Sequence, residues 1–168
     1  TSFYAFDKKI FHYLKKIGKS ERNEYELPDA IKLLSKNVEI HCVKAKQWLP
    51  IGYSWDLLKA DKILRRNKNS IGKNSEINGK VISSSIGNNC IINGIIKNSI
   101  IMDNSIIDKD SIVQDSVIGE NVYFQGKTHR LGAIIADNVM ARNVIIKPGC
   151  RIWPGKKISN RIMSKDIM

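Results

Sequence analysis

Aliphatic residues return about every six positions from Ser70 onward, and this spacing constrains the fold more than any other feature. A unit of Asn or Asp, then Ser, then two β-branched residues begins at Asn98, Asn104, Asp110 and Asp115. An amphipathic helix needs a spacing of about 3.6 residues and a half-buried strand needs a spacing of two, so neither explains the pattern. A repeat of about six residues indicates a parallel β-helix.

Each unit is expected to form one short flat strand and one corner, with three units completing a triangular coil. The first aliphatic residue of a unit should point inward and stack on its equivalent one coil away. So narrow an interior excludes rings, which explains why no aromatic residue occurs from Asp56 through Val122. Asn, Asp and Gly suit the corners because they tolerate positive φ.

We expect the β-helix at residues 69–158, with about five coils, and a cap or tail at residues 159–168. The spacing widens to nine residues at Ile77–Ile86 and Ile92–Ile101, so we expect a loop or short bulge in each interval. A solenoid of this kind needs capping at its ends.

One segment of the repeat, Glu120–Gly126, resembles a viral protease cleavage tag in its letters. Phe124, however, lies six residues after Ile118 and keeps the repeat in phase. We therefore interpret the segment as a native strand of the β-helix.

Residues 1–68 differ in composition and are predicted to form a separate domain of mixed α and β structure, containing nine of the 12 aromatic residues. Capping residues and apolar periodicity predict three helices, and alternation predicts two strands. The predicted helices are Asp7 to Gly18, Pro28 to Leu34 and Ser54 to Arg66, and the predicted strands are 3–6 and 38–43. The polar segment 65–69 is the predicted boundary.

The net charge of +12 is divided between the two ends of the chain. Residues 1–68 and 123–168 each sum to +7, whereas residues 69–122 sum to −2. This division does not give the single basic face with interleaved aromatics expected of a nucleic-acid-binding protein. Three widely spaced cysteines and the lack of a signal-peptide pattern or long apolar run predict a cytoplasmic protein without membrane association.

Three segments carry a resemblance to a known family. Ser20–Ile31 is similar to S-x-R-G-E-x-E-L-T-D-A-I, Trp48–Leu58 to W-x-D-I-G-x-P-W-D-L-L, and Leu131–Val139 to L-G-A-I-I-G-D-N-V. The chain resembles the C-terminal part of archaeal-type sugar-1-phosphate nucleotidylyltransferases, which carry a hexapeptide-repeat, left-handed parallel β-helix tail. The resemblance implies a partial α+β nucleotidyltransferase domain followed by that β-helix.

Such enzymes join a sugar 1-phosphate to a nucleoside triphosphate and release pyrophosphate, with Mg²⁺ as cofactor. The resemblance implies that Glu24 binds a sugar hydroxyl, with Ser2 and Tyr4 beside the sugar. Pro50 replaces an aspartate that often completes the metal site, which leaves Asp56 as the remaining candidate metal ligand. A first-turn acid that stabilises its helix is the alternative role for Asp56.

The chain departs from the family at the triphosphate site, because no Gly-rich, Arg-containing loop occurs in it. We expect no catalytic residue in this chain, and we expect it to be a fragment or one half of a split enzyme, inactive alone. Its β-helix is expected to form a homo-oligomer, most simply a trimer.

Two other functions stay open. A hexapeptide acyltransferase would use a His-x-x-Tyr pair, whose places are taken here by Lys109 and Ile112. The basic residues Lys127, His129 and Arg130 remain as a weak anion site for a phosphate or the pyrophosphate of coenzyme A. The second alternative is a non-catalytic regulatory or scaffold subunit.

Overall fold

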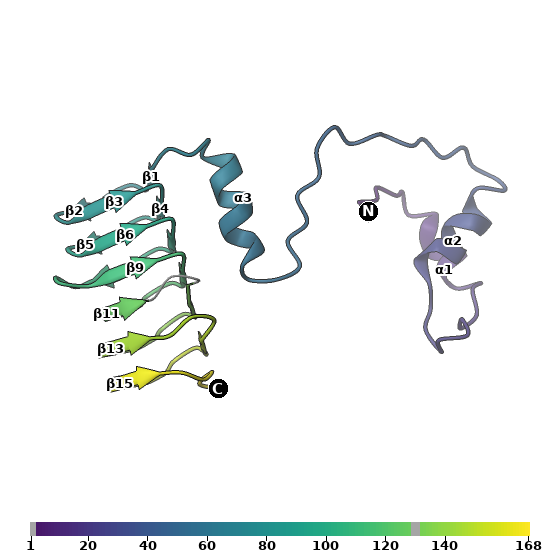
Figure 1. The fold of residues 1–168 in the computed structure, drawn as a ribbon. Helices are drawn as coiled ribbons and strands as arrows, with labels where there is room; N and C mark the ends of the chain where they lie inside the picture. Colours follow the sequence, from purple (N-terminus) through teal and green to yellow (C-terminus); the bar gives the residue numbers. More distant parts are fainter. Residues whose placement is uncertain (1–2, 129–131) are drawn as a thin grey trace. The chain divides into compact units, whose positions relative to one another are not determined.

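The structure is a computed structural model that describes residues 3–128 and 132–168. The chain divides into two compact units, Thr1–Trp48 and Leu49–Met168. The first contains two short helices, and the second contains one helix and a stack of parallel strands (Figure 1). The division therefore falls before residue 68, where we predicted the first domain to end, and the third helix belongs to the second unit.

Helices α1 (Ile10–Leu14) and α2 (Leu27–Leu34) pack against each other in the first unit. Both lie within segments predicted to be helical, and Pro28 occupies the first turn of α2, where its missing N–H has no cost. The side chains buried in their contact are Ile10, Ala30 and Leu34.

The two strands predicted in the first unit are wrong. Residues 3–6 and 38–43 are irregular, and the side chains of Phe3 and Val43 are 91% and 94% exposed. An alternating pattern forms a strand only where a neighbouring strand pairs with its backbone, and no strand is present among residues 3–48. The described part of this unit is thus helical and irregular, and it does not form the predicted α+β domain.

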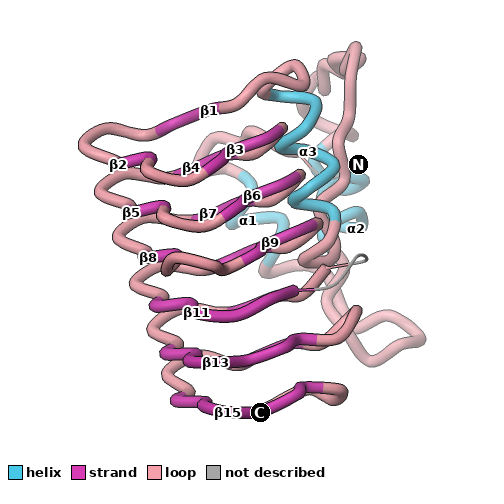
Figure 2. The backbone as a smooth tube through the Cα atoms, turned by 60° about the vertical axis from the view of Figure 1, so that its left-hand side comes forward, coloured by secondary structure: helices cyan, strands magenta, loops and turns pink. Residues whose placement is uncertain are grey.

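Helix α3 (Asp56–Leu64) lies beside the strand stack (Figures 1 and 2), within the helix predicted at residues 54–66. The Asp61 carboxylate accepts a hydrogen bond from the Ser85 hydroxyl and another from Arg65 Nε, the latter at 2.6 Å. Ala60 is buried. These contacts attach α3 to the first coils of the solenoid.

Six two-residue strands stack in parallel to form one face of the solenoid, here called sheet A. They are β1 (Ser70–Ile71), β4 (Ser85–Ile86), β7 (Ile100–Ile101), β10 (Val117–Ile118), β12 (Ile134–Ile135) and β14 (Arg151–Ile152). Paired residues lie 15 positions apart in the first coils (Ile71 with Ile86) and 17 apart later (Ile101 with Ile118).

The other two faces form one nine-stranded parallel sheet, called sheet B, because β11 runs from one face onto the other. Its strands are β2 (Glu76–Ile77), β3 (Lys80–Ile82), β5 (Ile91–Ile92), β6 (Ile95–Lys97), β8 (Ile106–Ile107), β9 (Ile112–Gln114), β11 (Tyr123–Thr128), β13 (Met140–Ile146) and β15 (Lys157–Met163). Figure 2 shows the coils stacked level upon level. This parallel β-solenoid agrees with the predicted β-helix.

The nine-residue intervals do not contain the predicted loops or bulges. Strands β3 and β6 occupy them, and each places one inward side chain, Val81 and Ile96, between the aliphatic residues of the other two faces. The coil is simply shorter there. The register shift of the solenoid lies instead between Phe124 and Gly126 in β11.

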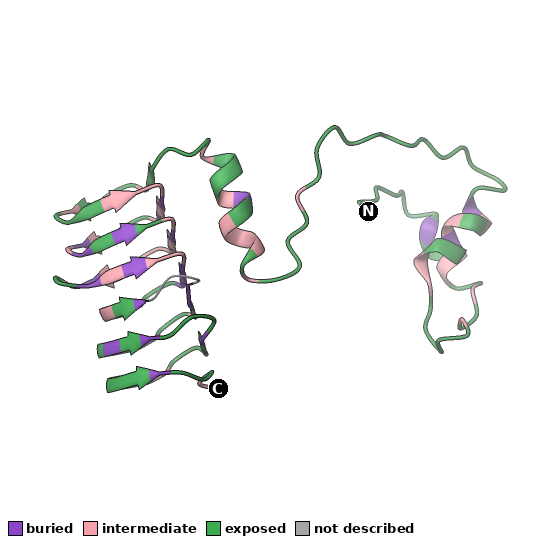
Figure 3. Ribbon diagram, viewed as in Figure 1, coloured by how far each residue is buried: buried purple, intermediate pink, exposed green. Residues whose placement is uncertain are grey.

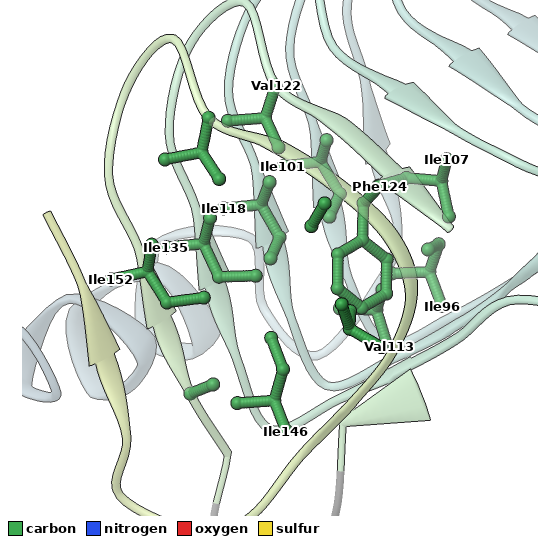
Figure 4. Close-up of a cluster of buried hydrophobic side chains, with 14 of the residues drawn as sticks. Ile96, Ile101, Ile107, Val113, Ile118, Val122, Phe124, Ile135, Ile146 and Ile152 are labelled. Carbon is green, nitrogen blue, oxygen red and sulfur yellow. The ribbon is translucent and has the colours of Figure 1, made fainter. Parts of the chain in front are cut away.

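Inward aliphatic side chains form one continuous core along the solenoid (Figures 3 and 4). The largest fully buried ones are Ile92, Ile96, Ile101, Ile107, Val113, Ile118, Val122, Phe124, Ile135, Val139, Ile146 and Ile152. Phe124 is the one aromatic side chain in this core among the described residues. The interior accepts its ring because Ala141 is its partner one coil further on. The interpretation of Glu120–Gly126 as a native segment is thereby supported.

Polar side chains satisfy the backbone at the corners. Asn74, Asn89, Asn104, Asn121 and Asn138 all have positive φ and succeed one another along one corner. Their amides form side-chain hydrogen bonds between coils, for example from Asn89 to Asn104 at 3.2 Å. Inside another corner, buried serines also form hydrogen bonds between coils. The Ser99 hydroxyl accepts a hydrogen bond from the backbone N–H of Ser116 at 3.1 Å and donates one to the carbonyl of Lys97 in its own coil. The corner preference for Asn is thus confirmed.

The last residues return to sheet A. Ile167 forms a parallel bridge with Ile152 beyond β14, and Asp166 accepts bonds from the backbone N–H and Nε of Arg151 at 2.8 and 2.9 Å. The predicted tail at 159–168 therefore contains the second half of β15 and this returning segment.

Candidate functional site

The predicted sugar-binding residues lie in the first unit, in and around the turn before α2. The carbonyl of Glu24 accepts a hydrogen bond from the Ser20 N–H at 2.8 Å, and its side chain is exposed. The neighbouring Glu26 makes the side-chain contacts, accepting from Arg22 at 2.7 Å and from the Ser20 hydroxyl at 3.3 Å. Sequence reasoning missed this ion pair, although its four-residue spacing is a known signal.

An open recess of about 510 Å³ lies over this turn and is lined by Ser20, Glu21, Arg22, Glu26, Pro28 and Asp29. Glu24 is not part of its lining. Tyr4 stacks on Phe6, with ring centroids 5.7 Å apart, and Ser2 lies outside the described residues. The structure therefore brings Arg22 and Glu26 together, and it does not join Tyr4 and Glu24 in this recess.

Asp56 has a structural task at the start of α3. Its Oδ2 accepts hydrogen bonds from the backbone N–H groups of Gly52 and Tyr53, both at 3.0 Å. Within residues 3–128 and 132–168 no group of three or more His, Cys, Asp or Glu side chains is placed to hold a metal ion. The described donors thus do not fit the Mg²⁺ site that the resemblance implies.

Lys127 lines a polar recess of about 390 Å³ on sheet B, together with Lys109, Asp110, Gln125 and Asn143. Lys109 stands where the resemblance places a catalytic base. His129 and Arg130, the other members of the predicted anion site, lie outside the described residues. Two lysines and one carboxylate, that of Asp110, thus line one recess, and this excess of positive charge suits an anionic group.

A neighbouring trio was missed by sequence reasoning. The Tyr123 hydroxyl donates to Asp108 at 2.6 Å, and the Arg142 guanidinium lies 5.3 Å from the centre of the Tyr123 ring. The hydrogen bond to Asp108 raises the pKa of Tyr123, and the same bond lowers the pKa of Asp108. These residues lie on successive coils, so only a known coil length would have predicted their contact.

The fold shows the class of protein: it is a parallel β-solenoid with stacked polar corners, preceded by a helix that contacts its first face. Residues 60–168 match the family described as the GMPPB C-terminal domain. The chain belongs to this family.

Its relatives include proteins named for two activities. The chain is 43% identical over 88 residues to the bifunctional protein GlmU of Methanococcus aeolicus, covering 49% of this chain and 21% of that protein. It is 42% identical over 88 residues to the GlmU of Methanocaldococcus jannaschii (49% and 22%). It is 34% identical over 89 residues to a bifunctional sugar-1-phosphate nucleotidylyltransferase/acetyltransferase of Sulfurisphaera tokodaii (49% and 22%).

The matched segment thus spans about a fifth of these relatives (21% and 22%). The resemblance to archaeal nucleotidylyltransferases is confirmed. Among the described residues, no helix has both the length and the apolar character needed to cross a bilayer.

Proposed function

We propose that this chain is the C-terminal, assembly-forming part of a sugar-1-phosphate nucleotidylyltransferase. The reaction of the whole enzyme, in the cytoplasm, would join a sugar 1-phosphate to a nucleoside triphosphate and release pyrophosphate. Its Mg²⁺ cofactor would be held by residues other than those that the structure describes, because these do not fit a metal site. The family match over residues 60–168 carries this proposal, and the names of the relatives supply the reaction.

The assembly role is supported by an outward column on sheet B, here called the isoleucine column. Register places Ile95, Ile112, Lys127, Ile145 and Ile162 one above another. Ile95, Ile145 and Ile162 are 43%, 38% and 65% exposed. An exposed apolar column on a flat face is typical of a surface that another subunit covers.

Pyrophosphate release by the protein that carries this chain tests the reaction. The assay supplies Mg²⁺ and a panel of sugar 1-phosphates and nucleoside triphosphates. Release that requires both substrates is the expected result. No release with any pair would contradict the proposal and favour the non-catalytic scaffold.

Sedimentation velocity tests the assembly. We expect the chain to sediment as a trimer, and we expect Ile145→Lys to shift it to a monomer, because Ile145 is the register partner of Lys127 and a second ammonium beside that lysine would lie unpaired in the interface. Lys127 already occupies the same column, so the fold accepts a lysine there. Val43→Lys, an exposed apolar position of the first unit, is the matched control and should leave the trimer intact. A monomeric wild-type chain at high micromolar concentration would refute this role.

The second candidate, an acetyltransferase, is favoured by the names of the relatives and by the cationic recess around Lys109 and Lys127. Its test is consumption of acetyl-coenzyme A with amino-sugar 1-phosphates. Loss of that consumption in His129→Ala, but not in His12→Ala, would establish it. Absence of consumption in the wild-type protein would remove this candidate.

A further inference from the structure

One corner of the solenoid changes character along the stack. In sheet A, the residue two positions before each strand from β4 to β14 has positive φ, and in order these residues are Ser83, Asn98, Asp115, Gly132 and Gly149. The first three project polar side chains over the corner. The last two have none, so the row of side chains stops after Asp115. At Gly132 the carbonyl oxygen of Asp115 fills the place of a side chain, because an added Cβ would lie 1.6 Å from it.

A recess of about 370 Å³ lies where this row stops. Its lining combines Trp55 and Leu58 from the α3 region with Asp115, Gly132, Ala133, Ile134, Gly149 and Arg151 from the solenoid. A Cβ added at Gly149 would meet no atom within 4 Å. Positive φ does not by itself explain this glycine, because Asn98 and Asp115 adopt the same conformation in earlier coils.

The outward side chains of sheet A become more exposed from β10 to β14. Val117 points outward, yet it is only 3% exposed. Ile134, one coil later, is half-buried, and Arg151, in the next coil, is exposed. The recess therefore opens at the last coils, beside an apolar wall of Ile134 and Leu58.

Trp55 and Asp115 in the recess are each in contact with a neighbouring side chain, and both can still contact a ligand. The Trp55 ring stacks on Tyr53, with centroids 4.7 Å apart and planes inclined by 12°. The Asp115 carboxylate accepts one bond on each oxygen, from Asn98 at 2.6 Å and from Gln114 at 3.1 Å. Each carboxylate oxygen has two lone pairs, so both oxygens can accept one bond more.

Arg151 supplies the complementary charge. Its Nε and one terminal nitrogen engage Asp166, each at 2.9 Å, while its side chain stays 57% exposed. A guanidinium carries five N–H donors, so donors remain for an anionic group. Asp115 and Arg151 lie two coils apart, about 10 Å along the stack at a strand spacing of 4.7–4.9 Å.

We propose that this recess binds a guanine mononucleotide, independently of the proposed nucleotidyl transfer. A carboxylate with one free acceptor site on each oxygen is complementary to two adjacent N–H donors. Among the common nucleobases, guanine presents such a pair at N1 and its 2-amino group. The base would lie against the indole of Trp55 and the apolar wall, and the phosphate would reach Arg151. A pocket of this volume falls within the range of small-molecule sites.

Isothermal titration of the whole chain with guanosine 5′-monophosphate tests the proposal. Inosine 5′-monophosphate lacks the 2-amino group, and guanosine lacks the phosphate, so each probes one end of the recess. We expect each to bind at least about tenfold more weakly, because the site then has a polar group without its partner.

The matched variants are Gly149→Asn and Gly155→Asn. Both glycines have positive φ (75° and 72°) and open space at the Cβ. In its corner row Gly155 follows Asn138, whereas Gly149 follows Asp115 and Gly132. Gly149→Asn projects a side chain into the recess and should abolish binding by obstructing the nucleotide, whereas Gly155→Asn, at another corner, should leave it unchanged.

Four results would overturn the proposal: no heat of binding at millimolar nucleotide, equal binding of the guanine and hypoxanthine nucleotides, retained binding in Gly149→Asn, or equal loss in both variants. Titration with acetyl-coenzyme A separates an acyl-donor site, because binding of that compound alone also overturns it. Pyrophosphate release does not enter this experiment, so the two proposals fail separately.

Discussion

The pairing of Phe124 with Ala141 predicts a strong energetic coupling between neighbouring coils. Both side chains are fully buried and are direct register partners. Phe124→Val removes four carbon atoms, which at about 0.8 kcal/mol per buried carbon predicts a loss of about 3 kcal/mol. Ala141→Val adds two methyl groups beneath the ring, and such overpacking costs about 1–3 kcal/mol.

The double variant places two valines where one large and one small residue now lie, so the total side-chain volume is nearly conserved. A volume-conserving exchange usually costs less than about 1.5 kcal/mol. We therefore expect the double variant to be more stable than Phe124→Val alone, although additivity predicts a loss of about 4–6 kcal/mol. The β-branched shape of valine also suits the strand backbone.

Urea unfolding followed by circular dichroism measures these free energies. The control pairs Ala141→Val with Ile86→Val. Ile86 lies in sheet A one strand before Ile92, and the register partners Ile92, Ile107, Phe124 and Ala141 place Ile92 three coils from Ala141. Distant sites add to within about 0.5 kcal/mol, so this pair should be additive. If Phe124→Val and Ala141→Val are also additive, the ring does not depend on the small partner and the reasoning is refuted.

Three further predictions concern the corners and sheet B. Asn104→Ala should destabilise the chain by about 1–2 kcal/mol, because Asn104 has positive φ; Asn104→Gly should lose less in urea unfolding, and equal losses would contradict this account. The raised pKa of Tyr123 means that its contribution to stability is present below the unfolded value of about 10 and lost as the pH rises through the folded value. In an ultraviolet titration, the difference between the wild type and Tyr123→Phe isolates the ionisation of Tyr123; Asp108→Ala should shift that ionisation to lower pH, whereas an unchanged midpoint would disprove the contact. The viral protease that recognises Glu120–Gly126 should cut the chain only after unfolding, and rapid cleavage of the native protein would contradict the strand.

The solenoid could be predicted from the sequence because its constraints are local. An inward position must be aliphatic, and a corner residue with positive φ is best Asn, Asp or Gly. Both rules apply to each unit by itself, so the inward position of Ile101 and the corner position of Asn104 can be predicted without knowing which residues lie next to them in space. The phase also placed Phe124 correctly, although its segment resembles a cleavage tag. The expectation that the interior excludes rings was wrong at this position, because the Phe124 ring is fully buried.

The functional residues were harder to predict because they depend on contacts between coils. Asp108 meets Tyr123 because the coil step there is 17 residues, which pairs Tyr123 with Ile106 and leaves Asp108 two positions further along the neighbouring coil. Three regular six-residue units would have given a step of about 18. The strands expected at residues 3–6 and 38–43 failed for the same reason. Alternation describes one segment, whereas a strand requires a second segment to pair with it.

The sequence by itself determined that residues from Ser70 onward form a stack of parallel coils with aliphatic cores and polar corners. The tertiary structure decided how many residues each coil contains, that α3 joins the solenoid rather than the first unit, and that a recess opens at Gly132 and Gly149. The physical reason is the range of the interactions. Each short unit determines its own backbone preference and the phase of its side chains. The alignment of one coil on the next depends on packing between residues 15 or 17 positions apart in the sequence.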